Sequence, residues 1–549
     1  MPDESPSVAT PQWTRAIDAS RLQPGHPIAV KLAGRHIALF AHDGEIHACN
    51  NRCPHEGYPL VEGALGADCR LTCHWHNWTF DLRTGINQYG GDNLRVYPAK
   101  VDDGAVWLDL SDPPRDVLAA RALAHLDEAI ADVDAPRIAR EVARLGKALA
   151  SLEQASRAAV AHAIVATHAR LRYGMTHAYA GAEAWLRMSD RVTGDVERLS
   201  CVTEALAHIA FDLRGEPHAP YASGERAWDA KSFHDAVEAQ DEAAAIEYAN
   251  GALVAGRSFR DLEPALTAAA LAHYNDFGHT LIYLSHVRRL IERLGPEVEQ
   301  PLVRCWIRSL TYATREDLLP DFGGYAGALN DWPDAAKQQP AAVPTSAQFE
   351  GNSIREALAA VSGVAGADPL ALYGALFEAA ARQLLRFDEA HALRTDNAVA
   401  DNVGWLDFSH ALTFAHAWRV QCARLPDHAA DLWPRGLLQL ALFVGRNKSY
   451  LADTADTDAE LRRWTVADEA GFDRRAIATI VDHGIGVPIF PVHWLKTWTA
   501  VHDEVALGLP DGARRAGLAA VNRLLAVRFK QRHALRNAHQ ALGFVAKED

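Results

Sequence analysis

Hydrophobic and polar positions along residues 13–110 follow the pattern of short β-strands. Apolar runs, such as residues 28–32 and 106–108, alternate with polar stretches, and Asp-Gly pairs stand at 43–44 and 103–104. Short apolar runs bounded by Asp-Gly turns are typical of strands. The N-terminal part of the chain is therefore predicted to be an all-β domain.

The pattern changes after a proline-containing stretch at residues 111–116. Beyond it, apolar residues recur at intervals of three and four, as at Val117, Ala120 and Leu123. This spacing is typical of amphipathic helices. We expect a multidomain α and β protein, with an all-β domain over residues 12–110, a linker, and a large all-α domain over residues 117–549.

Two segments interrupt the helical pattern. Residues 321–351 are rich in Gly, Pro and Ala, and a loop of this length is either a lid or binding loop, or a linker between subdomains. Residues 483–488 form a shorter break before another helix, which is expected to begin near Pro491.

Composition and charge narrow the function classes. The chain has 549 residues and a net charge of −15, from 55 basic and 70 acidic residues without long single-sign blocks. This argues against a nucleic-acid or anionic-membrane surface. No run approaches the roughly 20 apolar residues of a membrane span, residues 1–6 lack the features of a leader, and seven scattered cysteines form no disulfide framework. We expect a cytoplasmic protein.

A cysteine and histidine motif carries the most specific chemistry. The segments Cys53-Pro54-His55 and Cys73-His74-Trp75-His76 are separated by residues 56–72. Two thiolates and two imidazoles are the ligand set of a Rieske [2Fe–2S] cluster, with a potential of roughly −150 to +300 mV. Zinc accepts the same donor types and is the alternative. The predicted cluster ligands are Cys53, His55, Cys73 and His76, and the predicted chemistry is one-electron transfer.

The two half-motifs, with Gly57 and the run at 78–81 followed by Gly85, resemble those of Rieske ferredoxin and Rieske oxygenase domains. The resemblance implies an all-β fold with two loops around the cluster. Tyr58 and Trp75 stand where respiratory-chain Rieske proteins carry a disulfide, which disfavours that subclass. No Gly-rich nucleotide fingerprint follows a strand, so electrons are expected from an external ferredoxin or flavin reductase.

Histidine is the most unusual feature of the helical region, because most of the chain's 26 histidines lie there and histidine is the commonest metal ligand. Helical spacing places His279 and His286 on one apolar face with Tyr283. His410 faces inward by the same test, whereas His416 lies further round its helix. The remaining candidates are His177, in a segment of small residues, and His493, three residues before Lys496.

The segments 279–282, 410–413 and 493–496 resemble the His-containing segments of the questin-oxidase-like family, helical proteins that include fungal enzymes which oxidatively open anthraquinone rings. The resemblance implies a mononuclear non-haem iron, sometimes with a carboxylated lysine as oxygen ligand. Applied to this sequence, the resemblance implies that His279, His410 and His493 are the iron ligands. It also implies that Lys496 is the carboxylated lysine and that His177 is a fourth histidine.

Several assignments stay open at this second metal. Tyr283 stands where such proteins tend to have another histidine, so His286 is an alternative ligand, as is His416. Asp276 and Asp407 each precede a candidate by three residues and are either partners that orient the imidazole or surface acids. Lys496 is either a ligand or a solvated lysine. To become a ligand, its amine must first lose its proton, which burial favours, and then add carbon dioxide to form a carboxylate.

Two other metal sites and a non-enzymatic function compete with this interpretation. Asn402, Asp407, His410 and His416 imitate the mononuclear motif of other Rieske oxygenases, but with longer separations. A di-iron bundle requires Glu-x-x-His pairs, and this chain offers only Asp-x-x-His, at 276/279, 388/391 and 407/410. The non-enzymatic alternative is a Rieske electron carrier fused to a helical docking module.

The sequence thus predicts a Rieske-type non-haem iron oxygenase. Its cluster would relay electrons to a mononuclear iron that activates O2 and hydroxylates or ring-cleaves an aromatic or polyketide-like small molecule. A homo-oligomer is compatible with this function. Tryptophans near the proposed ligands either line an apolar pocket or pack in the core: Trp405, Trp418, Trp494 and Trp498.

Overall fold

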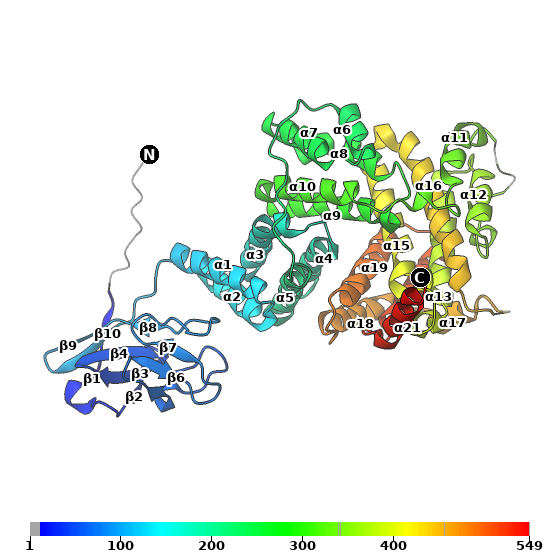
Figure 1. The fold of residues 1–549 in the computed structure, drawn as a ribbon. Coiled ribbons are helices and arrows are strands. Elements are labelled where there is room, and N and C mark those ends of the chain that lie inside the picture. The colour runs from blue at the N-terminus through cyan, green and yellow to red at the C-terminus, as the bar shows by residue number, and fades with distance from the viewer. Residues whose placement is uncertain (1–10, 339, 341, 455, 548–549) are drawn as a thin grey trace. The chain divides into compact units, whose positions relative to one another are not determined.

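The structure is a computed structural model that describes residues 11–338, 340, 342–454 and 456–547. Residues 1–6, where the sequence predicts no leader, lie outside this range. The chain divides into two compact units, residues 1–155 and 156–549, and each is described by itself. Strands precede helices along the chain (Figure 1), which confirms the predicted fold class.

The first unit contains three small antiparallel sheets, with strand orders β1-β10-β9, β2-β3-β4-β8 and β5-β6-β7. The predicted Asp-Gly turns join β3 to β4 and β9 to β10, with positive φ at both residues of each turn. The strands are β1 (Trp13–Asp18), β2 (Ile28–Leu32), β3 (Arg35–His42), β4 (Glu45–Asn50), β5 (Ala64–Leu65), β6 (Arg70–Thr72), β7 (Thr79–Asp81), β8 (Val96–Tyr97), β9 (Ala99–Asp102) and β10 (Ala105–Asp109).

Two helices complete the first unit, α1 (Arg115–Ala131) and α2 (Ala135–Leu149). Asp92, which follows the third sheet and is fully buried, lies 2.5 Å from guanidinium nitrogens of both Arg140 and Arg144 on α2. A buried carboxylate requires such partners. The second helix after the predicted linker is therefore tied to the loop that follows the third sheet; the predicted division at residues 111–116 stays a prediction.

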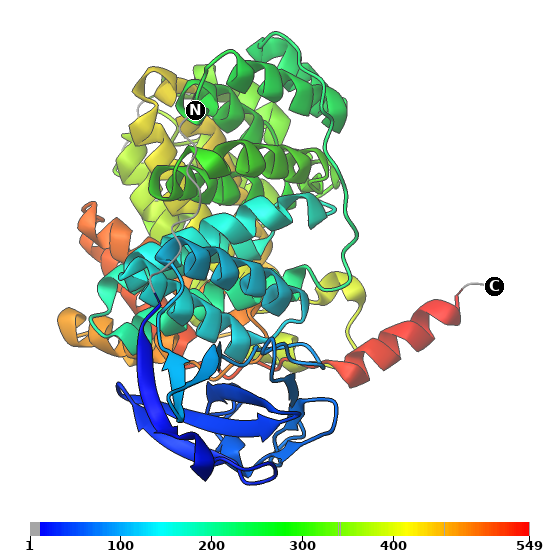
Figure 2. The same ribbon diagram turned by 90° about the vertical axis from the view of Figure 1, so that its left-hand side faces the viewer.

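The second unit is helical and begins within α3 (Leu152–Thr167) (Figure 2). The other helices are α4 (His177–Arg191), α5 (Asp195–Asp212), α6 (Ala230–Glu238), α7 (Glu242–Val254), α8 (Phe259–Ala270), α9 (His279–Leu294), α10 (Glu299–Thr311), α11 (Tyr325–Ala335), α12 (Ile354–Ser362), α13 (Pro369–Arg386), α14 (Glu389–Leu393), α15 (Trp405–Arg424), α16 (Ala429–Asn447), α17 (Ala459–Trp464), α18 (Glu469–Val481), α19 (Ile489–Ala506), α20 (Asp511–Leu525) and α21 (Ala534–Val545).

Four of these helices pack on one another at the centre of the unit: α4 on α9 and α19, and α15 on α9 and α19. Small residues allow the close approach. A Cβ atom at Gly181 on α4 would lie 2.5 Å from the Val492 side chain on α19. These helices therefore bring residues from 177 to 496 into one interior.

The two predicted interruptions have different outcomes. Residues 483–488 separate α18 from α19, which begins at Ile489, two residues before the expected start. Residues 321–351 differ from the expected loop, because they contain α11. The alanines of 326–336 favour helix, and α11 ends two residues after Pro333, as expected because proline disrupts a helix interior. No helix within the described ranges is long and apolar enough to cross a membrane.

Candidate metal centres

Two loops of the first unit repeat the same backbone hydrogen bonds around Cys53 and Cys73. The Cys53 amide donates to the Tyr58 carbonyl (2.9 Å), and the Cys73 amide donates to the Trp78 carbonyl (2.8 Å). Four residues after each cysteine, an amide returns to the cysteine carbonyl, and Gly57 and Asn77 at these positions both have positive φ. The sequence therefore builds two matching turns, each presenting a thiol.

The four predicted cluster ligands have unequal exposure. The two cysteines are 4% and 1% exposed, whereas His55 and His76 are accessible. The Nδ1 atoms of the two imidazoles lie 3.2 Å apart, and Trp78 stacks on His55 with ring centroids 4.4 Å apart. Burial, with Cys73 nearby, raises the pKa of Cys53 to about 11. A thiol of this kind becomes a thiolate when a metal replaces its proton, so the donor set fits a [2Fe–2S] cluster.

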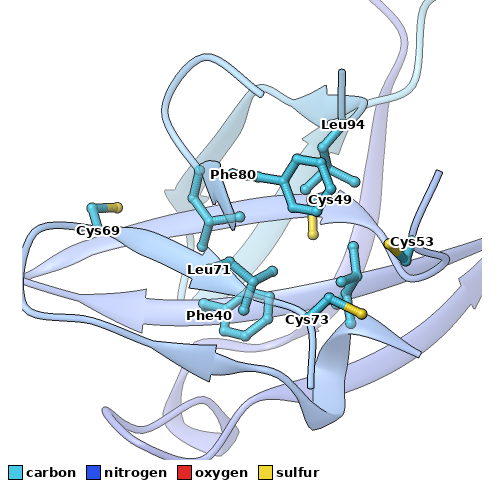
Figure 3. Close-up of a cluster of buried hydrophobic side chains, with 11 residues drawn as sticks. Phe40, Cys49, Cys53, Cys69, Leu71, Cys73, Phe80 and Leu94 are labelled. Atoms are coloured by element: carbon cyan, nitrogen blue, oxygen red, sulfur yellow. The ribbon is translucent and has the colours of Figure 1, made fainter. Parts of the chain in front are cut away.

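Figure 3 shows that the four cysteines of this domain lie in different places, and that the two predicted ligands are neighbours. Cys53 and Cys73 lie at one end of the buried apolar cluster, and Cys69 lies at the opposite end. Cys49 is fully buried in the middle of the cluster, on β4. Burial raises the pKa of both Cys49 and Cys69, as expected of inert core thiols.

A second group of histidines meets between α4, α9, α15 and α19. Nitrogens of His177, His410 and His493 lie within 4.8 Å of one another. The Nε2 atoms of His279 and His177 are 3.2 Å apart, and those of His493 and His410 are 3.1 Å apart. The structure thus brings together His177, His279, His410 and His493, the four histidines that the resemblance implies as ligands, one from each helix.

The other ring nitrogens of this group face oxygen atoms. His279 Nδ1 donates to the Asp276 carbonyl (2.5 Å), and His493 Nδ1 donates to the Ile489 carbonyl (2.6 Å). These bonds leave a lone pair on each Nε2. His177 Nδ1 lies 3.1 Å from the Tyr283 hydroxyl. A lone pair of this kind accepts either an N–H of the facing imidazole or a metal ion, and burial lowers the pKa of His177, His410 and His493, so the neutral imidazoles fit a metal ion.

The turn before His279 is unusual. Asp276, Phe277 and Gly278 have φ values of 44°, 47° and 77°, and only glycine adopts this region without strain. The Asp276 amide donates to the Thr314 carbonyl (3.0 Å), and the Gly278 amide donates to the Asn275 carbonyl (2.8 Å). This turn brings the Asp276 carbonyl to hydrogen-bond distance of the His279 imidazole, while the Asp276 carboxylate lies further away, at 3.7 Å from the same Nδ1.

Lys496 lies among the same helices, with 4% of its surface exposed. Its Nζ atom has no hydrogen-bond partner among the described residues. Burial lowers the pKa of this amine to about 7. A solvated helix lysine, the alternative from the sequence, does not match this position. His208 on α5, which the sequence analysis missed, is also buried, and nothing in its local pattern distinguishes it from a core histidine.

The other candidate residues have other partners. His286 Nδ1 lies 2.7 Å from Glu183, and His416 Nδ1 lies 2.9 Å from Glu504. The Asp407 carboxylate accepts from the Gly404 amide (2.9 Å) and from Arg446 (3.0 Å). The expectation that Asp407 orients His410 therefore does not match its contacts, because the carboxylate caps the start of α15.

The four tryptophans do not form one pocket wall. Trp418 is a core residue, which donates to the Leu432 carbonyl (3.0 Å) and meets Trp433 edge-on. Trp498 donates to Asp473 (3.3 Å) on α18. Trp405 alone of the four lines a described cavity, while Trp494 packs on Phe529.

Glu183 gives a prediction about stability. This buried carboxylate faces His286, with Arg289 at 3.8 Å and Arg187 at 3.9 Å. Burial alone raises its pKa, but the hydrogen bond and the two guanidinium charges outweigh burial and bring the pKa to about 2. We expect Glu183→Gln to lower the free energy of unfolding by about 3 kcal/mol at pH 7, because cations lose their buried partner.

The pH dependence follows from the direction of this shift. Glu183 stabilises the fold fully at pH values above the ordinary glutamate pKa of about 4.5. This stabilisation is lost as the pH falls towards about 2. The control is Glu292→Gln, an exposed partner of Arg288, which should cost less than about 1 kcal/mol. Guanidinium titrations followed by circular dichroism measure both values, and equal losses would contradict the assignment.

Comparison with known proteins identifies part of the chain. Residues 12–98 match the family model of the Rieske [2Fe-2S] domain. The chain is 31% identical over 104 residues to the ferredoxin component of the naphthalene 1,2-dioxygenase system of Pseudomonas putida, covering 19% of this chain and 99% of that protein. It is 35% identical over 105 residues to 4beta-methylsterol monooxygenase of Methylococcus capsulatus, covering 17% of this chain and only 28% of that protein.

Among solved structures, the ferredoxin of carbazole 1,9a-dioxygenase from Nocardioides aromaticivorans IC177 matches at 25% identity, over 19% of this chain and 100% of the ferredoxin, with a TM-score of 0.18. The relatives thus correspond to about a fifth of the chain.

Proposed function

The chain belongs to the Rieske [2Fe–2S] family through its N-terminal domain, and we propose that it is a Rieske-type non-haem iron oxygenase. Cys53, His55, Cys73 and His76 hold the cluster, which receives electrons from an external ferredoxin or flavin reductase. The helical region, over residues 117–549, is the catalytic domain and is of the questin-oxidase-like kind. Its substrate is an aromatic or polyketide-like small molecule, which is oxidised with O2.

One observation carries this proposal: four histidines from four helices converge with their Nε2 atoms inward, and two of them are held by backbone carbonyls. A hydrogen bond between two neutral imidazoles accounts for each close pair by itself, whereas one metal ion accounts for the convergence of nitrogens from both pairs. Imidazole nitrogens suit iron. His177, His279, His410 and His493 would hold the metal, and iron would supply dioxygen activation there.

Several residues of this chain prepare that site. Asp276 and Ile489 fix the tautomers of His279 and His493 through their carbonyls. The four helices bury three of the rings, since His279 and His410 are 8% exposed and His493 is 1% exposed. The buried amine of Lys496 loses its proton easily and can then take up carbon dioxide to become a carboxylate.

Metal analysis tests the proposal. We expect wild-type protein to hold about three irons per chain, two of them in the cluster. His410→Ala and His493→Ala should each lower this to about two, because either change removes one buried nitrogen donor, and the visible spectrum of the cluster should stay unchanged. Inductively coupled plasma mass spectrometry gives the metal content.

The matched control is His428→Ala, which changes an exposed histidine after α15 and should leave about three irons. The alternative function, an electron carrier with a helical docking module, predicts about two irons in all these proteins. A di-iron oxidase would instead give about four in the wild type. Unchanged iron in both interior variants would refute the ligand assignment.

A further inference from the structure

A cavity opens at the N-terminal ends of α15 and α19, the two helices that carry His410 and His493. Its volume is about 210 Å³. The lining comes from α14, residues 402–404, the start of α15, Phe490 on α19, residues between 528 and 533 after α20, and Arg536 on α21. The proposed function assigns no role to this cavity.

One wall of the cavity is aromatic. Phe490 and Phe529 stack with centroids 4.5 Å apart and an interplanar angle of 26°, and Trp494 packs on Phe529 at 5.6 Å. Trp405 contributes a further ring to the lining. Aromatic walls favour planar aromatic ligands through offset and edge-to-face contacts.

The same cavity has an unbalanced set of charges. Both carboxylates in its lining already have cationic partners: Asp407 accepts from Arg446 at 3.0 Å, and Glu389 lies 3.5 Å from Arg523. Arg528 has neither a hydrogen-bond nor an ion-pair partner among the described residues.

Two further cations stand in the lining. Lys530 donates only to the Leu393 carbonyl, at 3.3 Å. Arg536 is occupied by the carbonyls of residues 391, 392 and 394. The cavity therefore offers one free guanidinium and one weakly engaged ammonium to an anion.

The lining of the cavity lies close to the histidine cluster along α15 and α19. Leu406 lies four residues before His410 on α15, and Phe490 lies three residues before His493 on α19. Residues three or four apart share a helical face and are separated by about one turn, roughly 5.4 Å. A ligand on these side chains is thus within about one helical turn of the histidine cluster.

We propose that this cavity binds the substrate, and that the substrate is an aromatic compound bearing an acidic group, whose rings pack on Phe490 and Phe529 and whose anion meets Arg528 and Lys530. This inference rests on the proposed function for its chemistry, and adds the substrate class and the specificity residues. The volume lies below the roughly 300 to 1,000 Å³ of pockets for drug-sized ligands. A compound of one or two rings is therefore favoured.

The test uses 2-naphthoate as the acidic probe and 2-naphthalenemethanol as its neutral counterpart, titrated into the iron-loaded full chain by calorimetry without reductant. Wild type should bind the acid, and the neutral probe at least roughly tenfold more weakly, because a charge-assisted hydrogen bond is lost. Arg528→Ala should weaken binding of the acid roughly tenfold and leave binding of the alcohol unchanged. Phe529→Ala should weaken binding of both probes.

The matched control is Arg532→Ala, an exposed arginine of the same segment outside the lining, which should bind both probes like wild type. Equal effects of the two arginine variants, or no binding of 2-naphthoate by wild type, would overturn the inference. Binding requires no turnover, so its outcome is separate from that of the iron analysis. If His410→Ala keeps about three irons while Arg528→Ala loses affinity, the ligand assignment alone fails.

Discussion

Cys53→Ser is expected to abolish the [2Fe–2S] cluster. The thiol lies at one end of the apolar cluster, where the hydrogen bonds of its turn fix its direction. A serine hydroxyl holds its proton far more firmly and is a poor iron ligand. The variant should lose the visible absorption and the reduced-state electron paramagnetic resonance signal of the cluster, along with about two irons per chain.

Cys49→Ala is the matched control, because Cys49 is equally buried in the same domain but is not one of the four ligands. It should keep the full cluster spectrum and lose about 1 kcal/mol of stability as its buried sulfur is removed. A Cys53→Ser protein with a normal cluster, or a Cys49→Ala protein without one, would contradict the ligand set.

Lys496→Ala is expected to remove the proposed carbamate and to weaken the proposed binding of iron in the helical region. Since burial brings the pKa of this amine to about 7, a large fraction is neutral at physiological pH. Only the neutral amine forms a carbamate with carbon dioxide, releasing a proton. Wild type equilibrated with 13C-bicarbonate should show a carbamate carbon in its NMR spectrum, and the variant should lack that signal and hold about two irons.

Lys448→Ala serves as the control for this experiment, because its side chain is 43% exposed and should take up no carbamate. Acetate offered to Lys496→Ala should partly restore the third iron, since a small carboxylate can enter the space left by the side chain. A carbamate signal that survives in Lys496→Ala would show that another amine is modified.

The sequence was most informative where chemistry is local. The predicted cluster ligands lie in two short segments, and the resemblance to Rieske domains implied the two loops that carry them. The inward direction of His279 and His410 followed from helical spacing, because their faces are apolar. The start of α19 was predicted within two residues, since glycine and proline mark the preceding break.

What could not be predicted depends on contacts between distant segments. Glu183 faces His286, a residue 103 positions away in the chain, and no spacing rule connects them. The sequence left the role of Asp276 open between an orienting partner and a surface acid, and it did not indicate the turn with positive φ whose carbonyl bonds His279. The tryptophans were grouped by sequence, yet Trp418 and Trp405 face different neighbours because helical rotation separates them.

The turn at residues 276–278 bears on how the helical centre would choose among ions. The strain in this backbone costs of order 1–3 kcal/mol per non-glycine residue. The cost is part of the folding free energy and is already present before a metal binds. His279 is therefore preorganised and loses little freedom when an ion is bound. A rigid donor does not adapt its position to ionic radius. Selectivity at this centre would then depend on how well the radius of each ion fits donor positions that the backbone has already fixed.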